Sequence, residues 1–466
     1  MLLEEPDSAE RGIEILSYLT NKTAFKNVIA SSSTALTSIL SAAPSSSFGV
    51  ASILSALTVS IEQQRKDAFR DKEITEEQYK ELQKMAMEKS TSEQDELDPI
   101  EAVSTRIMAV VDAGGLLTLK DIIVKAEYTS SSKTVAMEAC MQIATERGVR
   151  GAMIQAGVLK AAIELLKEDC EEKLAAHARF CIAKMLVTTN PIMLSDAQVS
   201  PRATSTRNTR SGKLFVPRAS FTHTVYMPPS QCMGSIPPLL HLVQEHTSTN
   251  LQQFEGLLSL TNLGGANAAT KSHIIASKGV KIISYQVYSE HELVRRAAVE
   301  CVANLLPHEK TCEYFTVANN FKIWSAYARD YEAQFETSRA AAGGLAMAVS
   351  DWDVKLTVLE LLEEGTEWVL DLIESANLEL MHRGVVFVKN LMINNEVEGA
   401  PEDVPEKYKN LKKRIEEAVK GTKLHDTITV LALKGDEMCR TEVEEGGLGD
   451  GGEQVILLCK QIIYLK

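Results

Sequence analysis

The chain has 466 residues, a net charge of −14 and only 5% aromatic residues. Its apolar residues are mainly aliphatic, which favours packed helices over a sheet-based sandwich or barrel. The acidic balance argues against broad nucleic-acid binding, which needs a basic surface, and fits a protein that meets other proteins.

The N-terminal part contains a long uncharged stretch, from residue 27 to residue 61. Because Pro44 and three serines interrupt it, it predicts two short buried helices, Ala30–Ala42 and Phe48–Ile61, and no membrane span. The first residues carry acids where an export signal needs bases followed by an apolar core. Eight scattered cysteines with no C-x-x-C spacing fit reduced thiols, so the sequence predicts a cytoplasmic protein without a membrane anchor.

Two phrases further along the chain repeat one another, VVDAGGLLTLKDII around Gly114 and MIQAGVLKAAIELL around Gly157, and IIASKGVKIISYQV around Gly279 is similar. Equivalent alanines of the first two, Ala113 and Ala156, are 43 residues apart. In each phrase we expect glycine to end one helix before the next turns back. A period of about 40–47 residues with helical apolar stripes is typical of armadillo and HEAT repeats. The sequence therefore predicts an all-α fold, a right-handed superhelical solenoid of armadillo/HEAT-type repeats.

Three segments interrupt this order. Residues 62–99 are highly charged and predict a long connecting helix with a loop. Residues 195–235 are rich in Ser, Thr, Pro and Arg and predict a flexible insert. Residues 436–454 are acidic and glycine-rich and predict a loose loop, after which a final helix caps the array.

Several motifs resemble catalytic or nucleotide-binding sites, but each lacks a residue or a structural context that such a site needs. The segment Gly447–Gly452 matches G-x-G-x-x-G, but it follows several glutamates that would repel a phosphate and has no strand before it. Residues 265–272 resemble a phosphate-binding loop but have Thr270 where the second glycine is needed. His291 lacks the second histidine of a zinc helix, because Arg295 stands there. We expect no enzyme, no cofactor and no metal site.

Three helical phrases, FEGLLSLTNL, RAAVECVANL and HRGVVFVKNL, align by their ends. Asn262, Asn304 and Asn390 then share one position, at intervals of 42 and 86 residues, and Met347 takes that place in the intervening repeat. Eight residues upstream of this position stand four long side chains: Phe254, Arg296, Arg339 and His382.

These positions predict a peptide-binding groove on the concave side of the solenoid. An asparagine amide offers a donor and an acceptor, so repeated asparagines can pair with the backbone of an extended peptide, while neighbouring cations and aromatic rings anchor it. In the alternative interpretation, each asparagine only secures the loop after its own helix. Arg296 and Glu300 belong to the predicted groove as well, although they can equally form a simple pair within one helix.

The same phrases resemble the UCS family of myosin chaperones, and the resemblance extends over nearly the whole chain. The most specific pieces are FEGLLSLTNLGGAN, LVRRAAVECVANL and MHRGVVFVKNLMIN, and EKLAAHARFCIAKMLVTTNP resembles the opening of the UCS domain. The resemblance implies a central armadillo-like segment over residues 1–112 and a UCS armadillo-repeat domain over residues 113–466. It also implies a non-enzymatic chaperone that binds the myosin motor domain through the groove and assists its folding and stability.

In that family, the aromatic residue and the asparagine of the first phrase form part of the clamp, which places Phe254 and Asn262 in the same role. Many members have tyrosine where Phe254 stands, so the hydroxyl is missing here while stacking remains. Animal members also carry a tetratricopeptide module that docks the tail of Hsp90, and no 34-residue repeat of that kind occurs in this sequence. The resemblance implies an Hsp90 co-chaperone, but the tail-docking module is absent from this sequence, which is either a piece of a longer protein or a short member of the fungal type.

The alternative function is an armadillo-repeat scaffold or adaptor that reads linear motifs of other partners. An importin-like cargo receptor would place a tryptophan on the same helix as each asparagine. The three tryptophans, Trp324, Trp352 and Trp368, do not fall in that register. We therefore favour the chaperone, with no nucleic-acid or membrane partner.

Overall fold

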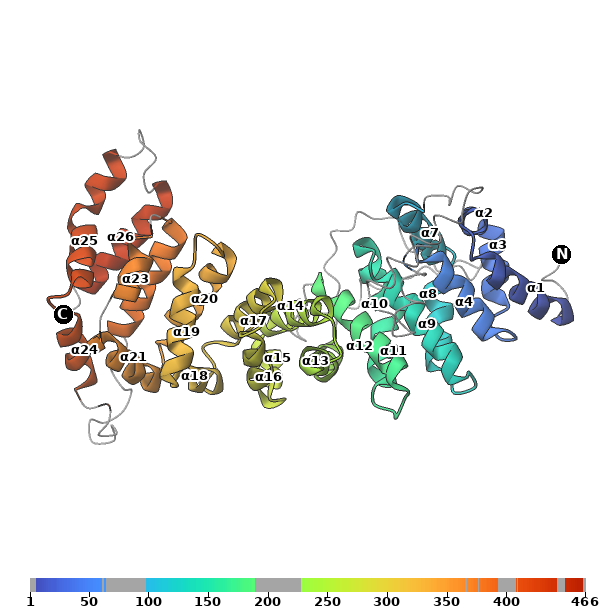
Figure 1. Cartoon of the computed structure of the whole chain (residues 1–466), viewed down its shortest axis with the longest axis horizontal. Helices are drawn as coiled ribbons and strands as arrows, with labels where there is room; N and C mark the ends of the chain where they lie inside the picture. Colours follow the sequence, from blue (N-terminus) through green and yellow to red (C-terminus); the bar gives the residue numbers. More distant parts are fainter. Residues whose placement is uncertain are drawn as a thin grey trace, which may run out of the picture. The chain divides into compact units, whose positions relative to one another are not determined.

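The computed structural model describes residues 6–60, 63, 98–188, 228–364, 367–375, 377–392, 408, 410–441 and 449–463. Within these residues every regular element is a helix, which confirms the predicted all-α solenoid (Figure 1). The chain forms two compact units, Met1–Ser248 and Thr249–Lys466. Residues 1–112 and 113–466, the family segments implied by the sequence, stay a prediction.

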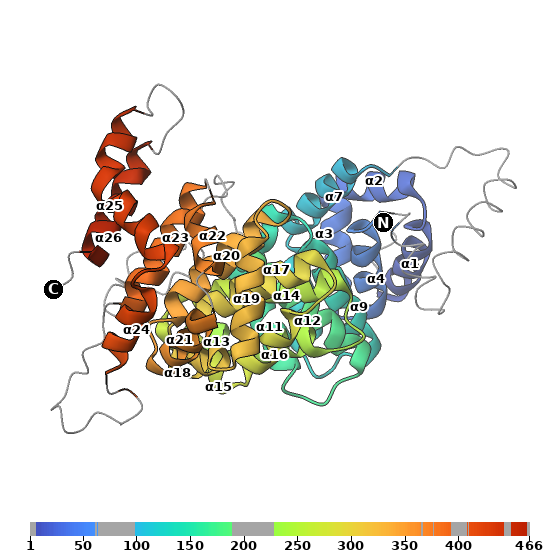
Figure 2. The same ribbon diagram turned by 60° about the vertical axis from the view of Figure 1, so that its left-hand side comes forward.

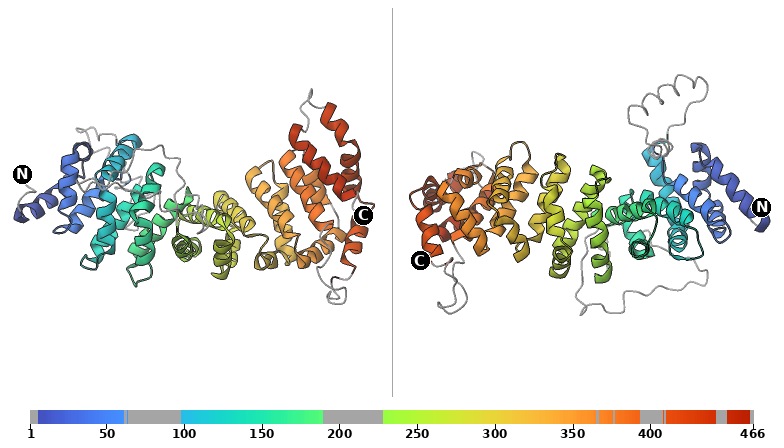
Figure 3. Two further views of the ribbon diagram at one scale, coloured as in Figure 1. Left: turned by 180° about the vertical axis from the view of Figure 1, so that it is seen from behind. Right: turned by 60° about the horizontal axis from the view of Figure 1, so that its bottom comes forward.

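The first unit is built from helices that recur in groups of three. These are α1 (Pro6–Leu19), α2 (Thr23–Ser31), α3 (Ser33–Ser41), α4 (Ser47–Leu57), α7 (Ile100–Asp112), α8 (Gly115–Val124), α9 (Ser130–Ile143), the short 3-10 helix η1 (Arg147–Val149), α10 (Arg150–Ala156), α11 (Val158–Leu165), α12 (Glu172–Val187) and α13 (Pro229–Gln244). Helices α1, α4, α9 and α12 pack on one another in this order, as the blue-to-green helices of Figure 3 show. Their contact faces are aliphatic, and Ile53, Leu54 and Met137 are fully buried.

The uncharged stretch of this unit folds nearly as the sequence predicts. The predicted helix Ala30–Ala42 is divided in two, because the Ser32 side chain accepts a hydrogen bond from Ala35 N and starts α3 there. The second predicted helix corresponds to α4, which ends at Leu57, four residues earlier than expected. In the part of the chain that the structure describes, no helix is both long and apolar enough to cross a membrane.

A buried charged cluster joins α2, α4 and α7. The Arg106 guanidinium is almost fully buried and pairs with Asp98 at 2.7 Å, and it also donates to the Leu57 carbonyl at 2.9 Å. Lys26 Nζ donates to the Val59 carbonyl at 2.9 Å. These bonds secure the carbonyls at the C-terminal end of α4, which lack partners within their own helix.

The second unit continues the three-helix period. Its helices are α14 (Asn250–Ala266), α15 (Ala268–Ala276), α16 (Gly279–Gln286), α17 (Glu292–Leu305), α18 (Glu309–Phe315), α19 (Ala318–Arg329), α20 (Phe335–Ala348), α21 (Trp352–Glu364), α22 (Glu367–Ile373), α23 (Leu378–Met392), α24 (Leu411–Val419), α25 (Lys423–Thr441) and α26 (Gly449–Ile463). The third helix of each repeat packs on the third helix of the next, in the order α14, α17, α20, α23 and α26 (Figure 2). The second helix of a repeat packs against the third helix of the same repeat, as α19 does against α20 and α22 against α23.

The glycine signals that revealed the repeat are confirmed at two of three places. Gly114 and Gly157 adopt left-handed backbone, with φ of 94° and 87°, between consecutive helices. The prediction for Gly279 is wrong, since Lys278 takes the left-handed conformation with φ of 62°. Gly279 begins α16, where a Cβ would lie 2.5 Å from the Ile274 carbonyl oxygen. Close packing, and not backbone freedom, therefore explains this glycine.

Two of the three predicted interruptions, 195–235 and 436–454, are shorter than expected. Most of residues 62–99 and 195–235 lies outside the described residues, but residues 229–235 form the first turns of α13, which starts with Pro229 at a position that suits proline. The predicted loop 436–454 is likewise helical at both ends, where it belongs to α25 and α26. Acidic composition alone does not end a helix, because glutamate and methionine are good helix formers.

Candidate peptide-binding face

All eight predicted groove residues lie on four helices that stack in succession, α14, α17, α20 and α23, which we call the third-helix row. Small residues allow this stacking. A Cβ on Gly344 in α20 would lie 2.5 Å from the Trp324 ring of α19, and one on Gly384 in α23 would lie 2.9 Å from Ile373 of α22. Each third helix can therefore sit directly on the second helix of its own repeat.

The asparagines occupy equivalent places in this row. Asn304 Nδ2 donates to the Thr261 carbonyl of α14 at 3.2 Å, and Asn390 Nδ2 donates to the Ala346 carbonyl of α20 at 2.8 Å. In both cases the acceptor directly precedes the aligned residue of the neighbouring repeat, Asn262 or Met347. The structure thus reproduces the register that the sequence alignment predicts.

These bonds differ from the alternative interpretation, in which each asparagine secures the loop after its own helix. Asn304 and Asn390 instead bridge to the preceding third helix. The Ala346 carbonyl lies in the last turn of α20, and Ser350 N bonds to Met347 and not to Ala346. Asn390 therefore supplies a partner for a carbonyl at the helix end. One N–H of each carboxamide is used in this way, and the group has a second N–H and an acceptor oxygen.

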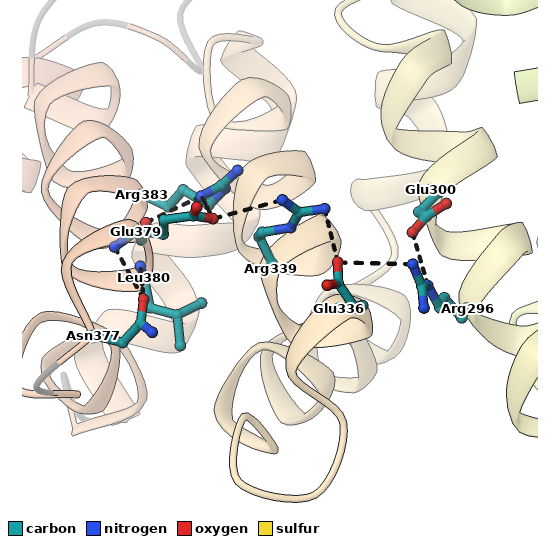
Figure 4. Close-up of polar contacts among 8 residues, drawn as sticks. All are labelled: Arg296, Glu300, Glu336, Arg339, Asn377, Glu379, Leu380 and Arg383. Atoms are coloured by element: carbon teal, nitrogen blue, oxygen red, sulfur yellow. Dashed lines mark hydrogen bonds and ion pairs between the residues drawn. The ribbon is translucent and has the colours of Figure 1, made fainter. Parts of the chain in front are cut away.

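A row of alternating charges crosses three third helices, from the middle of α17 to the first turns of α20 and α23 (Figure 4). We call it the charge row, and its members, in order along it, are Glu300, Arg296, Glu336, Arg339, Glu379 and Arg383. Within helices the nitrogen–oxygen distances are 3.0 Å in α17, 2.8 Å in α20 and 3.4 Å in α23. Between helices both distances are 3.7 Å. All six side chains are partly exposed, which weakens these pairs, although Glu336 Oε2, the atom that both Arg296 and Arg339 contact, is itself buried.

The local structure of α23 positions the end of the charge row. Asn377 Oδ1 accepts hydrogen bonds from the backbone N–H groups of Glu379 and Leu380 and starts the helix there (Figure 4). Arg383, four residues after Glu379, then reaches it across one turn. The predicted pair of Arg296 and Glu300 exists within α17, and Arg296 also contacts Glu336 of the next repeat.

His382 is placed differently from the two arginines with which it aligns. Its side chain is half-buried, and burial followed by the charge of Arg383 lowers the pKa of the imidazole. The ring is therefore neutral at physiological pH. The neighbouring Arg383 takes the place in the charge row that the alignment assigns to His382.

Three members of the charge row were missed from the sequence: Glu336, Glu379 and Arg383. A signal existed for the two acids, because they are 43 residues apart and so share one repeat position. Arg383 is displaced by one residue from the period and could not be found from spacing. Phe254 and Asn262 on α14 are half-buried, and their role in a client clamp stays a prediction. Among the described residues, no group of acidic, histidine or cysteine side chains is arranged to hold a metal ion.

Several curated relatives of the chain are named unc-45 homolog B. Protein unc-45 homolog B of Xenopus tropicalis is 32% identical over 160 residues, which are 33% of this chain and 17% of that protein. The protein of the same name from Danio rerio is 25% identical over 386 residues, 82% of this chain and 37% of that protein. The chain thus spans well under half the length of these relatives. No family model matches the sequence.

Solved structures show the same fold. UNC-45 from Drosophila melanogaster superposes with a TM-score of 0.69 and 21% identity, over 98% of this chain and 49% of that one. The myosin chaperone UNC-45 from C. elegans, in complex with an Hsp90 peptide, has a TM-score of 0.69 and 18% identity over 99% of this chain and 43% of that one. She4p has a TM-score of 0.59 and 16% identity over 97% of this chain and 54% of that one.

Stacked three-helix repeats with an ordered row of third helices define an armadillo-type solenoid protein. Its repeat phrases and its unc-45 relatives confirm the family resemblance seen in the sequence. The chain is therefore similar to the UCS family in sequence and in fold.

Proposed function

We propose that this chain is a myosin-directed chaperone, which binds the motor domain of myosin and assists its folding and stability without catalysing a reaction. Support comes from the relatives named unc-45 homolog B and from the solved structure of the myosin chaperone UNC-45. The proposed client contact is the third-helix row, in particular its faces that carry Phe254, Asn262, Arg296, Arg339 and Asn390.

The observation that carries this proposal is the repetition of amide and charged groups on consecutive helices at the repeat interval. Asn304 and Asn390 each place a carboxamide at the end of a third helix, bound in the same way to the helix before it. A surface that repeats one chemical group at a fixed spacing suits an extended peptide, whose backbone groups also repeat. A partly folded motor domain exposes such extended segments, and a native one hides most of them.

Chaperone partners belong to the same proposal. The neighbouring UNC-45 structures from C. elegans were solved with an Hsp90 peptide and with an Hsp70 peptide. We propose that this chain works beside such chaperones, by holding the motor domain while they act.

The test is a protection assay with a purified myosin motor domain. The motor domain is heated until it aggregates, with and without a stoichiometric amount of the chain, and aggregation is followed by light scattering. We expect strong suppression for the motor domain and little for an unrelated heat-labile enzyme. Binding of the native motor domain without protection would instead indicate an adaptor that reads a linear motif, and no binding to either form would reject the proposal.

A further inference from the structure

The charge row has a composition that distinguishes it from most charged binding surfaces. It contains three arginines and three glutamates in strict alternation, so it is net neutral while each helix presents both signs. Such a surface attracts neither polyanions nor polycations over long range. Any selectivity it has must come from the order of charges along a partner.

The row is not required to hold the helices together. The third helices pack through fully buried apolar residues such as Val302, Leu345 and Val388. Side-chain hydrogen bonds from Asn304 and Asn390 also link α17 to α14 and α23 to α20. Partly exposed ion pairs add little to such contacts. The pairs between helices are also the longest in the row, at 3.7 Å, against 2.8–3.4 Å for those within helices. The contacts between helices are therefore the ones that a partner can replace at least cost.

The geometry sets the spacing of a matching partner. Packed helices lie about 8–10 Å apart, and an extended chain advances about 3.3 Å per residue. An extended segment that crosses the row therefore meets a new helix about every third residue. The four groups from Arg296 to Glu379 alternate in sign over two such helix spacings, so the side chains on one face of an extended segment, at every second residue, meet opposite signs in turn. A segment of one sign would therefore meet a like charge at two of these four groups.

We propose that the charge row selects an extended client segment of mixed charge, in which acidic and basic side chains alternate at every second residue, the positions that share one face of an extended chain. The client's charges replace the pairs between helices, so that Arg296 and Arg339 bind client carboxylates while Glu336 and Glu379 bind client ammonium or guanidinium groups. The proposal rests on the proposed function, since it names the chemistry of the segment that the third-helix row holds.

The test uses labelled peptides of about twelve residues and fluorescence anisotropy with the full chain. One peptide alternates Glu and Lys at every second residue, one carries Lys at all those positions, one carries Glu, and one has the alternating composition in blocks. We expect the alternating peptide to bind at least about ten-fold more tightly than the others, because only it avoids like-charge contacts. Equal affinity for all four peptides would overturn the proposal.

Charge-reversed variants make the test specific to this row. Arg339→Glu is expected to weaken the alternating peptide about five- to ten-fold, and the double variant Glu336→Arg, Arg339→Glu keeps an internal pair while reversing its polarity. The double variant places two arginines and then two glutamates along the centre of the row, so it should lose the preference for the alternating peptide and bind the block peptide more tightly. Lys413→Glu, in an exposed pair with Glu417 on α24, is the matched control outside the row. Circular dichroism and melting temperature establish that each variant is folded.

The same variants separate this proposal from the proposed function. If the motor domain binds the wild-type chain and Arg339→Glu equally well, the charge row has no selective role, although the chaperone function stands. If the motor domain binds neither, the proposed function fails, and the peptide series still reports whether the row distinguishes charge order. A peptide preference that is identical in wild type and in Arg339→Glu would likewise reject the charge row.

Discussion

The side chain of Asn390 on α23 donates a hydrogen bond to the Ala346 carbonyl on α20, one repeat earlier, at 2.8 Å. The acceptor is a carbonyl in the last turn of its helix, and the bond is partly shielded from water. One asparagine therefore does for the neighbouring repeat what a C-terminal cap does within a single helix. This gives the repeated asparagine a role in coupling repeats, whether or not a client is bound.

Replacing this asparagine should destabilise the second unit. We expect Asn390→Ala to lower its free energy of unfolding by about 1–2 kcal/mol, because the Ala346 carbonyl loses a partner in a half-buried site. Asn390→Asp should cost at least as much, since a carboxylate cannot donate to a carbonyl. Thermal unfolding followed by circular dichroism measures both. Lys389→Ala, one residue earlier, serves as the control, and equal melting temperatures for it and Asn390→Ala would contradict the coupling role.

Two adjacent glycines of α20 should respond oppositely to alanine. A Cβ on Gly344 would lie 2.5 Å from the fully buried Trp324 ring, so Gly344→Ala should cost about 1–3 kcal/mol and displace the ring. A Cβ on Gly343 would meet only the flexible Arg383 side chain, at 3.3 Å. Gly343→Ala should be neutral or gain up to about 1 kcal/mol, because alanine is the better helix former.

Melting temperature and tryptophan fluorescence together distinguish the two variants. Gly344→Ala should lower the melting temperature and change the emission of Trp324, while Gly343→Ala should do neither. A similar loss in both variants would mean that α20 tolerates no added volume on either side.

The solenoid fold could be predicted from the sequence, because its apolar residues and its helix ends recur at the interval of the structural repeat. The asparagine register was also predictable, since Asn304 and Asn390 contact residues that align with one another. The backbone conformation was harder to predict from the sequence. Lys278, and not Gly279, is left-handed, and the close approach of Ile274 explains why residue 279 is a glycine. The charge row could not be assembled either, because its pairs join different repeats and Arg383 lies one residue out of phase.

Stability of the first unit should depend on pH through Lys26. Burial, with a smaller contribution from Arg106, lowers the pKa of this lysine to about 8 from its usual 10.5. Between these values the unfolded chain binds a proton that the folded chain does not, so stability rises with pH through that window. Below about pH 8 the cost of a buried charge is fully present.

A comparison of Lys26→Met with wild type isolates this effect. The difference in melting temperature, variant minus wild type, should be largest near pH 7. It should fall by at least about 2 °C between pH 7 and pH 10, which is the change expected from about 1 kcal/mol in a unit of this size. Lys22→Met, at an exposed lysine one turn earlier, controls for general alkaline effects. A constant difference across this range would show that Lys26 keeps its ordinary pKa when folded.

Client binding should depend on Phe254 and Asn262, the two residues of α14 that the family resemblance assigns to the clamp. We expect Asn262→Ala to weaken binding of a myosin motor domain by about five-fold to over a hundred-fold, the range that corresponds to a loss of about 1–3 kcal/mol. Phe254→Ala should weaken it similarly by removing an anchoring ring. Neither variant should unfold the array, because the stability of a solenoid is spread over many contacts between neighbouring repeats.

Measuring affinity and melting temperature on the same variants separates binding from structural support. If Asn262 acts as Asn304 and Asn390 do, coupling one repeat to the next, Asn262→Ala lowers the melting temperature while the folded protein binds the motor domain normally. If it contacts the client, affinity falls and the melting temperature changes little. Lys281→Ala, at an exposed position on α16 outside the third-helix row, should alter neither quantity. If neither Asn262→Ala nor Phe254→Ala changes the affinity, the client does not bind at α14, because these two residues are the clamp predicted on that helix.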